Sequence, residues 1–274
     1  MLPGTFQAKK KDGTIYYRSS ITHKEKHISL GSFPSEADAH AAYLAARTLL
    51  SRPIDPEVFL SNFTENSDFP ISFDKGIILI NLFQNHMYIS NPIYLRKNYF
   101  SYYLSPTEEL KFDIDDLFYY SSHRIIRRKG HLFVNDYGMQ VTILSRYGIQ
   151  PHAVCGRDYI FVNGDASDWR YSNIQILNPY HGVLICEQKG IRKYRVRIHI
   201  NGNFTVGVYS TPEKAAIAYN KAVDLAHRAG INKNFPENYI ESLSGKEYAD
   251  LYTKLKIAPK YINYLQTVSS NTSK

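Results

Sequence analysis

Residues 194–222 read YRVRIHINGNFTVGVYSTPEKAAIAYNKA and predict two strands, a tight loop and a helix. Apolar and cationic side chains alternate strictly over residues 194–200, and a period of two is typical of a strand with one buried face. A three-residue loop over 201–203 places Ile198 opposite Val206, which keeps the apolar side chains of both strands on one face. We therefore expect an antiparallel hairpin covered on its apolar face by the helix that follows.

The helix is expected to begin after Thr211, which offers an N-cap, with Pro212 at the first helical position. Glu213 follows, and an acidic residue is favourable in the first turn. The residues at helical spacing after it are Ala215, Ala218, Tyr219 and Ala222. Because most of them are small, the helix can lie close against the sheet.

The opposite face of the first strand is cationic. Arg195, Arg197 and His199 point away from the apolar side, and no acidic residue lies between Glu187 and Glu213. A run of cations without compensating carboxylates favours a polyanionic partner. The Lys and Arg residues in this run are Lys189, Arg192, Lys193, Arg195 and Arg197.

A second copy of the same unit lies at the N-terminus. Gly31 aligns with Gly207, and the next twelve positions continue without a gap to Tyr43 and Tyr219. Two copies this far apart are duplicated modules rather than a solenoid, which needs stacked neighbours. The outward positions of the N-terminal copy are less basic: Arg18, Ser20, Thr22 and Ser29 lie on its strands, and Lys24, Lys26 and His27 at its loop.

Both copies have strand–strand–glycine–helix order and a G-x-[FY] followed by a capped A-x-x-A-Y helix, and the second ends in NFPE at 234–237. In these features the unit resembles the plant ethylene-response-factor type of DNA-binding domain, the Apetala-two fold, over about residues 4–50 and 181–237. The resemblance implies a three-stranded sheet that lies in the major groove and reads bases with its outer face. Thr205 and Ser29 stand where the family usually has tryptophan. By position the reading role falls on Arg195, Arg197, His199 and Thr205 and on Arg18, Ser20, Thr22 and Ser29, with Arg192, Lys193, Lys24 and Lys26 as further DNA contacts.

Residues 159–178, YIFVNGDASDWRYSNIQILN, resemble the HNH endonuclease core, V-D-H-I-N-G-D-x-x-D-N-R-x-x-N-L-R. In that family an Asp and a late Asn hold one divalent metal and a His activates water. Here Ile160 and Phe161 occupy the Asp and His positions, and neither side chain can bind a metal or accept a proton. We expect a nuclease scaffold retained for binding, with no metal and no catalytic residue, in which Asp168 pairs with Arg170. The matching positions are Asn163, Gly164, Asp165, Asp168, Arg170 and Asn173.

The chain has 274 residues, enough for two or three domains, and its 43% hydrophobic content predicts a folded protein. The formal net charge of +8 again favours a polyanion. Cys155 and Cys186 give neither a disulfide framework nor a metal site. No apolar stretch approaches the roughly 18 residues that a membrane span needs, so we expect none.

Between the modules, residues 51–70 predict a connection that could hold one helical turn, and residues 71–120 predict aromatic strands, beginning with FDKGIILINLF and ending with FDIDDLFYY. Residues 121–144 predict paired strands around turns at 129–130 and 136–138. The basic cluster beside the first turn is either a phosphate contact or a solvated hairpin tip: Arg124, Arg127, Arg128 and Lys129. Residues 240–265 predict one or two helices, broken near Pro259.

The expected fold is α+β, with two small three-stranded-sheet-plus-helix modules flanking a β-rich, degenerate HNH-like (ββα) central domain. The parts are a module at 1–50, a linker at 51–70, the centre at 71–180, a module at 181–237 and a helical extension at 238–274.

The predicted function is sequence-preferring binding of double-stranded DNA without a cofactor, by a regulator derived from a homing-type HNH endonuclease that has lost cleavage. An active homing endonuclease with atypical catalytic residues and an RNA-binding or ribonucleoprotein component that binds structured RNA remain alternatives. The expected location is cytoplasmic and nucleoid-associated in a bacterium or phage, or nuclear in a eukaryote.

Overall fold

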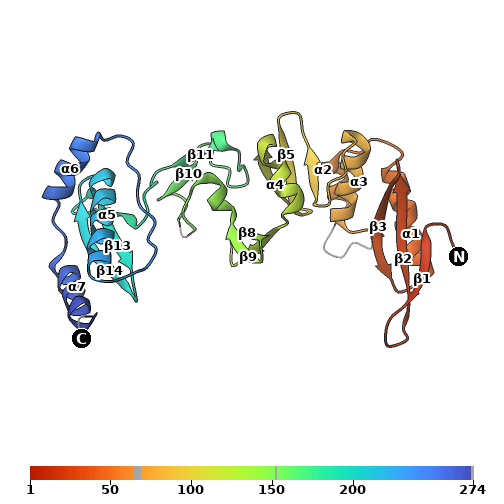
Figure 1. The fold of residues 1–274 in the computed structure, drawn as a ribbon. Coiled ribbons are helices and arrows are strands. Elements are labelled where there is room, and N and C mark those ends of the chain that lie inside the picture. The colour runs from red at the N-terminus through yellow and green to blue at the C-terminus, as the bar shows by residue number, and fades with distance from the viewer. Residues whose placement is uncertain (64–68, 152, 273–274) are drawn as a thin grey trace. The chain divides into compact units, whose positions relative to one another are not determined.

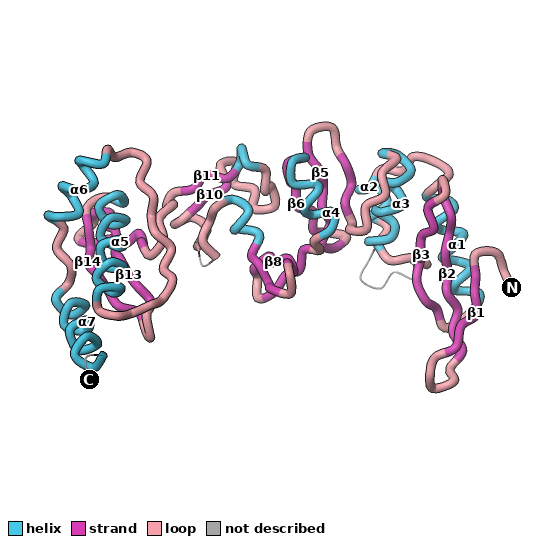
Figure 2. The backbone as a smooth tube through the Cα atoms, viewed as in Figure 1, coloured by secondary structure: helices cyan, strands magenta, loops and turns pink. Residues whose placement is uncertain are grey.

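The computed structural model describes residues 1–63, 69–151 and 153–272 (Figure 1, Figure 2). Over these residues the chain is mixed α+β, with seven α-helices and five small antiparallel sheets, which confirms the predicted class at this level. The chain forms two compact units. One comprises Met1–Ile143 with Phe161–Ile174, and the other comprises Leu144–Ile160 with Gln175–Lys274. The five-part division of the sequence stays a prediction.

The first module is the sheet of β1 (Thr5–Lys9), β2 (Ile15–His23) and β3 (Lys26–Phe33) with helix α1 (Glu36–Leu49) against it (Figure 1). Ser35 caps α1, since its side chain accepts a hydrogen bond from the Asp38 N–H. The core continues from the sheet into α3 (Phe73–Asn85).

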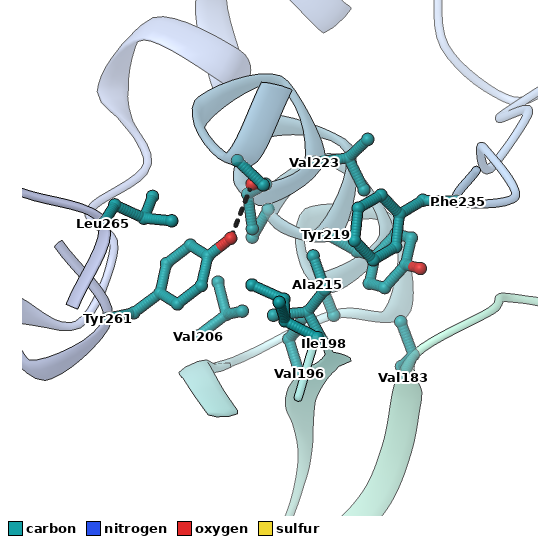
Figure 3. Close-up of a cluster of buried hydrophobic side chains, with 14 of the residues drawn as sticks. Val183, Val196, Ile198, Val206, Ala215, Tyr219, Val223, Phe235, Tyr261 and Leu265 are labelled. Atoms are coloured by element: carbon teal, nitrogen blue, oxygen red, sulfur yellow. Dashed lines mark hydrogen bonds between the residues drawn. The ribbon is translucent and has the colours of Figure 1, made fainter. Parts of the chain in front are cut away.

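The second module is the sheet of β12 (Val183–Gln188), β13 (Ile191–His199) and β14 (Asn203–Tyr209) with helix α5 (Pro212–Arg228). Thr211 caps α5 as predicted, accepting from the Lys214 N–H. Figure 3 shows the shared core, in which valine and isoleucine side chains of the sheet meet the small residues and Tyr219 of α5.

Two helices follow the second module, α6 (Gly245–Lys254) and α7 (Pro259–Thr272), so the predicted break near Pro259 is confirmed. Tyr261 of α7 is fully buried in the module's core, and its hydroxyl donates to the Ala222 carbonyl at 2.8 Å (Figure 3). Phe204 of β14 stacks on Tyr264, with ring centroids 4.1 Å apart. Helix α7 therefore closes the apolar face of the sheet that α5 leaves open.

The register of the β13–β14 hairpin differs from the predicted one. Ile198 pairs with Phe204 rather than Val206, and the three loop residues are 200–202. A β-bulge explains the difference, because Val206 is an extra residue opposite β13 and is fully buried. Because the bulge keeps Val206 on the buried face, the two strands still share one apolar face. The loop comes one residue earlier than predicted.

The same bulge occurs in the first module. There the register shifts between Ser19 and Ser20, and Leu30 is the extra, buried residue. Ser19 faces Gly31 in the first sheet just as Val196 faces Gly207 in the second. The duplication detected in the sequence therefore extends to an irregularity of the backbone.

A glycine–tyrosine contact that the sequence pattern does not indicate is also duplicated. Gly4 and Gly182 precede the first strand of each sheet at φ +77° and +72°, and a Cβ on either would lie 2.2 Å from the ring of Tyr43 or Tyr219. Only glycine fits such a backbone so close to a ring. Each glycine carbonyl also accepts an N–H from the second strand, in the pairs Gly4–Ser20 (3.1 Å) and Gly182–Arg197 (2.8 Å).

The prediction of strands beginning at FDKGIILINLF is wrong at that point, because this run forms α3. Ile77, Ile78, Leu79 and Ile80 are each at most 2% exposed, so the helix is buried on several sides and its sequence shows no polar stripe. The connection before it also contributes to the core, since α2 (Pro56–Ser61) buries Phe59 and Leu60.

The next segments are strands as predicted: β4 (Ile93–Leu95), β5 (Tyr99–Ser105) and β6 (Glu108–Asp113) form one sheet. The predicted strand FDIDDLFYY, however, ends at Asp113 and continues into a 3-10 turn and helix α4 (Leu117–Ser122). The hairpins of β7 (Ile125–Arg128), β8 (His131–Asp136) and β9 (Met139–Thr142) are confirmed. Their turns have positive φ at Lys129, Gly130, Tyr137 and Gly138.

The predicted ββα order of the centre is wrong in its last element. Strands β10 (Tyr159–Phe161) and β11 (Ile174–Ile176) form the hairpin. Residues 177–182, all of them described, then lead into β12 without a helix. This segment, LNPYHG, is short and contains a proline and a positive-φ glycine, both unfavourable within a helix.

None of the described helices is long and apolar enough to cross a bilayer.

Candidate nucleic-acid interface

The face of the second sheet that points away from α5 carries five of the six contacts predicted for this module. Strand pairing places Arg195 between Leu184 and Val208, and Arg197 beside Thr205. The adjoining positions on this face are Lys193, His199 and Asn203, with His199 Nδ1 3.1 Å from Asn203 Oδ1.

The cations of this face have no carboxylate partner. Arg197 is exposed, whereas Arg195 is half-buried between its apolar neighbours. Among the described residues, no acidic group lies within 4 Å of the side-chain nitrogens of Lys193, Arg195 or Arg197, and none of the three donates a side-chain hydrogen bond to the protein. Their charges are therefore available to an external anion.

The dimensions of the face suit a DNA groove. Three strands about 4.8 Å apart span about 10 Å, and the major groove of B-DNA is about 12 Å wide. Arg195 and Arg197 are two residues apart on one strand, so their Cα atoms are about 7 Å apart along it. Arginine can contact phosphate or the O6 and N7 atoms of guanine.

Arg192 lies elsewhere on the sheet. It pairs with Glu187 across β12 and β13, so its side chain starts from the face that carries Tyr194 and α5. It is nevertheless exposed, because it lies near the end of the strand. The structure thus groups Lys193, but not Arg192, with Arg195 and Arg197.

The equivalent face of the first module is mostly neutral. Ser20 pairs with Ser29, and Thr22 lies further along the same face. Arg18 is exposed and is held on this face by Tyr16, whose hydroxyl accepts from Arg18 Nη2 at 2.8 Å. Tyr16 was missed from the sequence, although its i, i+2 spacing from Arg18 places both on one face of a strand.

Lys24 and Lys26 do not lie with Arg18. Lys26 pairs with His23 on the opposite face of the hairpin, and its ammonium lies 4.7 Å from the ring centroid of Tyr88. Lys24 Nζ lies 3.4 Å from Nδ1 of His86, the C-cap residue of α3. Both lysines are exposed and have these partners within their own unit.

The HNH-like loop is a hydrogen-bonded scaffold. Asn173 accepts from the Asn163 N–H at 2.8 Å and donates to the Asp168 carbonyl at 2.8 Å. Asp168 is 1% exposed and accepts two hydrogen bonds from Arg170, at 2.8 and 2.6 Å, as expected for an internal pair. Asp165 accepts from both the N–H and the hydroxyl of Ser167, which fixes the turn.

The electrostatics of the loop agree with this role. The side-chain hydrogen bond from Arg170 holds the pKa of Asp168 below its ordinary value, and the same bond raises the pKa of Arg170. The hydrogen bonds from Ser167 likewise lower the pKa of Asp165. Both carboxylates are therefore ionised at neutral pH.

The loop is anchored to β6, since Lys111 accepts from the Trp169 N–H at 2.8 Å and donates its own N–H to the Ser167 carbonyl at 2.9 Å. Phe161 packs edge-on against Trp169, with ring centroids 5.1 Å apart. Within the described ranges, no three His, Cys, Asp or Glu residues lie close enough together to hold a metal ion.

The basic cluster at the β7–β8 hairpin is partly neutralised by internal contacts. Arg124 pairs with Asp74 at 2.7 Å, and Arg127 pairs with Glu108. Arg128 donates to Gln140 at 2.9 Å. Of the two interpretations left open by the sequence, these contacts favour a solvated hairpin.

Comparison of the chain with family models, with curated proteins and with solved structures finds no match.

Proposed function

We propose that the protein binds double-stranded DNA through the outer face of β12, β13 and β14. The observation that supports this most strongly is the pair Arg195 and Arg197, which share one open face with no carboxylate partner among the described residues. Unpaired cations on a protein surface gain free energy at a phosphate backbone by releasing condensed counterions. In this proposal the second module supplies most of the affinity.

The first module is the second contact. Its outer face offers hydroxyl groups, the exposed ring of Phe6 and one arginine, a composition suited to contacts with bases or sugars rather than to phosphate neutralisation. We propose two duplicated DNA-binding modules flanking a centre derived from an HNH nuclease. In that centre the 163–173 loop acts as scaffold, and the protein regulates transcription or the DNA of a mobile element.

The proposal favours duplex DNA over duplex RNA because the major groove of A-form RNA is too deep and narrow for a sheet to enter. Single-stranded RNA is read mainly by exposed aromatic residues, whereas the face around Arg195 carries Leu184, Val208 and the Thr205 hydroxyl.

The test is a fluorescence-anisotropy titration of the full chain with a random duplex DNA pool over a salt series. Replacing Arg195 and Arg197 by alanine should weaken binding about 100-fold, since each contact contributes about 1–3 kcal/mol, and should lower the salt slope by about two. The matched control is the pair Lys246→Ala and Lys260→Ala, which removes the same charge from exposed positions of α6 and α7.

If both double variants lost the same affinity for duplex DNA, the loss would come from net charge alone. That result would refute binding through the face that carries Arg195 and Arg197. Tighter binding to an RNA hairpin than to duplex DNA at matched salt would refute the choice of nucleic acid. Phe161→Ala serves as a further control and should leave the affinity nearly unchanged.

A further inference from the structure

An apolar groove of about 760 Å³ runs beside α1 in the first unit. One wall is the surface of α1 formed by Ala41, Leu44, Ala45 and Thr48, here called the α1 outer wall. Leu44 is 46% exposed, and Val58 of α2, which also lines the groove, is 60% exposed. Large apolar side chains left this open beside a concave surface are typical of an interaction site.

The second module shows what such a wall can hold. With Gly31 aligned to Gly207, the α1 outer wall corresponds to a surface of α5 that helix α6 covers. Ile217 of that surface is fully buried and belongs to a cluster with Leu251 and Tyr252 of α6. The corresponding pairs are Ala41–Ile217, Leu44–Asn220, Ala45–Lys221 and Thr48–Asp224.

Polar contacts hold α6 in place on α5. Asn220 donates to the Tyr248 hydroxyl at 3.1 Å, and the Tyr252 hydroxyl donates to Asp224 at 2.7 Å. The ammonium of Lys221 donates to carbonyls at the C-terminal end of α6, at 2.6 Å to Tyr252. A helix on this wall is therefore the arrangement that the duplicated scaffold already uses once.

The α1 outer wall lacks the polar groups that hold α6 on α5. Where α5 has an amide, an ammonium and a carboxylate, α1 has Leu44, Ala45 and Thr48. A tyrosine hydroxyl placed there would lose its partners, whereas a leucine side chain would lose none. Of the two charged residues that line the groove, Asp55 caps α2, and Arg52 has no ion-pair partner among the described residues.

We propose that the α1 groove binds an amphipathic helix of a partner protein, seated on α1 as α6 is seated on α5. The helix presents leucine-type side chains at i, i+3, i+4 and i+7 to the α1 outer wall, and a carboxylate to Arg52. A second copy of this chain is a poorer occupant. Its α6 is already held by Lys221 and Asp224, and two α1 outer walls facing each other would contribute only Leu44 as a large apolar side chain.

The probe is a labelled synthetic peptide of residues 240–257 that carries Tyr248→Leu and Tyr252→Leu, titrated with the full chain by fluorescence anisotropy. We expect saturable binding. It should weaken at least tenfold with Leu44→Glu, and the peptide with both tyrosines retained should bind more weakly than the probe. The matched control is Phe118→Glu, which places the same carboxylate at a side chain of the same unit that is 89% exposed. Ala45→Glu is the second variant if Leu44→Glu fails to give a native circular dichroism spectrum.

Three results would overturn the proposal. The first is no saturable binding up to about 1 mM peptide, and the second is equal binding to the wild-type chain and to Leu44→Glu. The third is dimerisation of the chain alone that Leu44→Glu abolishes, because the groove would then belong to a second copy.

Discussion

The two modules share a scaffold and differ in almost everything that faces solvent. Both contain the same β-bulge, the same positive-φ glycine against a tyrosine ring and the same stripe of small helical residues. Their outer sheet faces differ, with Arg195 and Arg197 in one and Arg18 with Ser20 in the other. Their helices also differ on the side away from the sheet, where Leu44 is 46% exposed and its counterpart Asn220 is 8% exposed.

The residues that fix the backbone of each sheet are therefore shared, whereas the side chains on its outer face differ. The bulge shifts the register of each hairpin and so sets which side chains of the third strand point outward, and both copies contain it. Outward side chains contribute little to stability and can diverge with their partners. Substitutions in both modules and in the loop between them test this separation.

The scaffold should fail equally in both modules. Gly182→Ala and Gly4→Ala should each cost about 4 kcal/mol of unfolding free energy, because the new Cβ would meet a tyrosine ring at 2.2 Å and the backbone φ is positive. Gly202→Ala, with no atom within 4 Å of the added Cβ, should change the stability by less than about 0.5 kcal/mol. Urea unfolding measures all three variants. A small loss of unfolding free energy for Gly4→Ala beside a large loss for Gly182→Ala would show that the two modules do not depend equally on this contact.

The helix surfaces should respond unequally to a reciprocal exchange. Asn220→Leu should cost about 2–3 kcal/mol, because Asn220 accepts from the Asn238 N–H at 2.9 Å and donates to the Asn238 carbonyl at 2.8 Å, both in the interior. Leu44→Asn should be within about 0.5 kcal/mol of neutral, since that side chain is 46% exposed. Thermal melts of the two variants compare them directly, and similar losses would mean that the two surfaces are used alike.

Acid sensitivity should mark the unit that carries the 163–173 loop. Because Asp168 has a pKa lowered below 3.8 by Arg170, its ionised form stabilises the fold above that pH, and this contribution is lost as the pH falls through the lowered value. Asp168→Asn should cost about 2 kcal/mol at pH 7, a low figure for a buried pair because the Arg170 side chain is 36% exposed. The difference from the wild-type chain in melts between pH 7 and pH 2 should shrink towards zero. A difference that stays constant with pH would contradict the pairing.

The smallest effect should come from the first module's arginine. Arg18→Ala should weaken duplex binding about threefold, against about tenfold for Arg195→Ala, because Arg18 is the one arginine of a mostly neutral face and is already held by Tyr16. The same anisotropy titration measures both. A larger loss for Arg18→Ala would reverse the proposed division between the two faces.

Much of the local structure could be predicted from short-range signals. The turns at 129–130 and 136–138 were correct because glycine at each marks a backbone that a strand cannot continue. The outward placement of Arg195, Arg197 and His199 followed from alternation alone. Continuing that alternation back to Arg192 would have assigned it to the other face, as the structure does.

The rest depended on contacts distant in sequence. Helix α3 was missed because burial on several sides leaves no amphipathic period in its sequence. The β13–β14 register was missed because Phe204, Val206 and Val208 alternate perfectly, yet the bulge puts Val208 on the outer face beside Arg195. That Arg124 and Arg127 would be paired with Asp74 and Glu108 could not be inferred, since these partners lie 50 and 19 residues away.

The contact of Lys221 with the end of α6 has a chemical consequence. Its nitrogen donates to the carbonyls of Tyr252 and Leu255 at 2.6 and 2.9 Å, so its amine is sequestered from reagents while the helix stays docked. An acylating reagent should modify the exposed Lys246 quickly and Lys221 slowly. Mass spectrometry of the labelled chain would then report, without any substitution, how often α6 dissociates from α5.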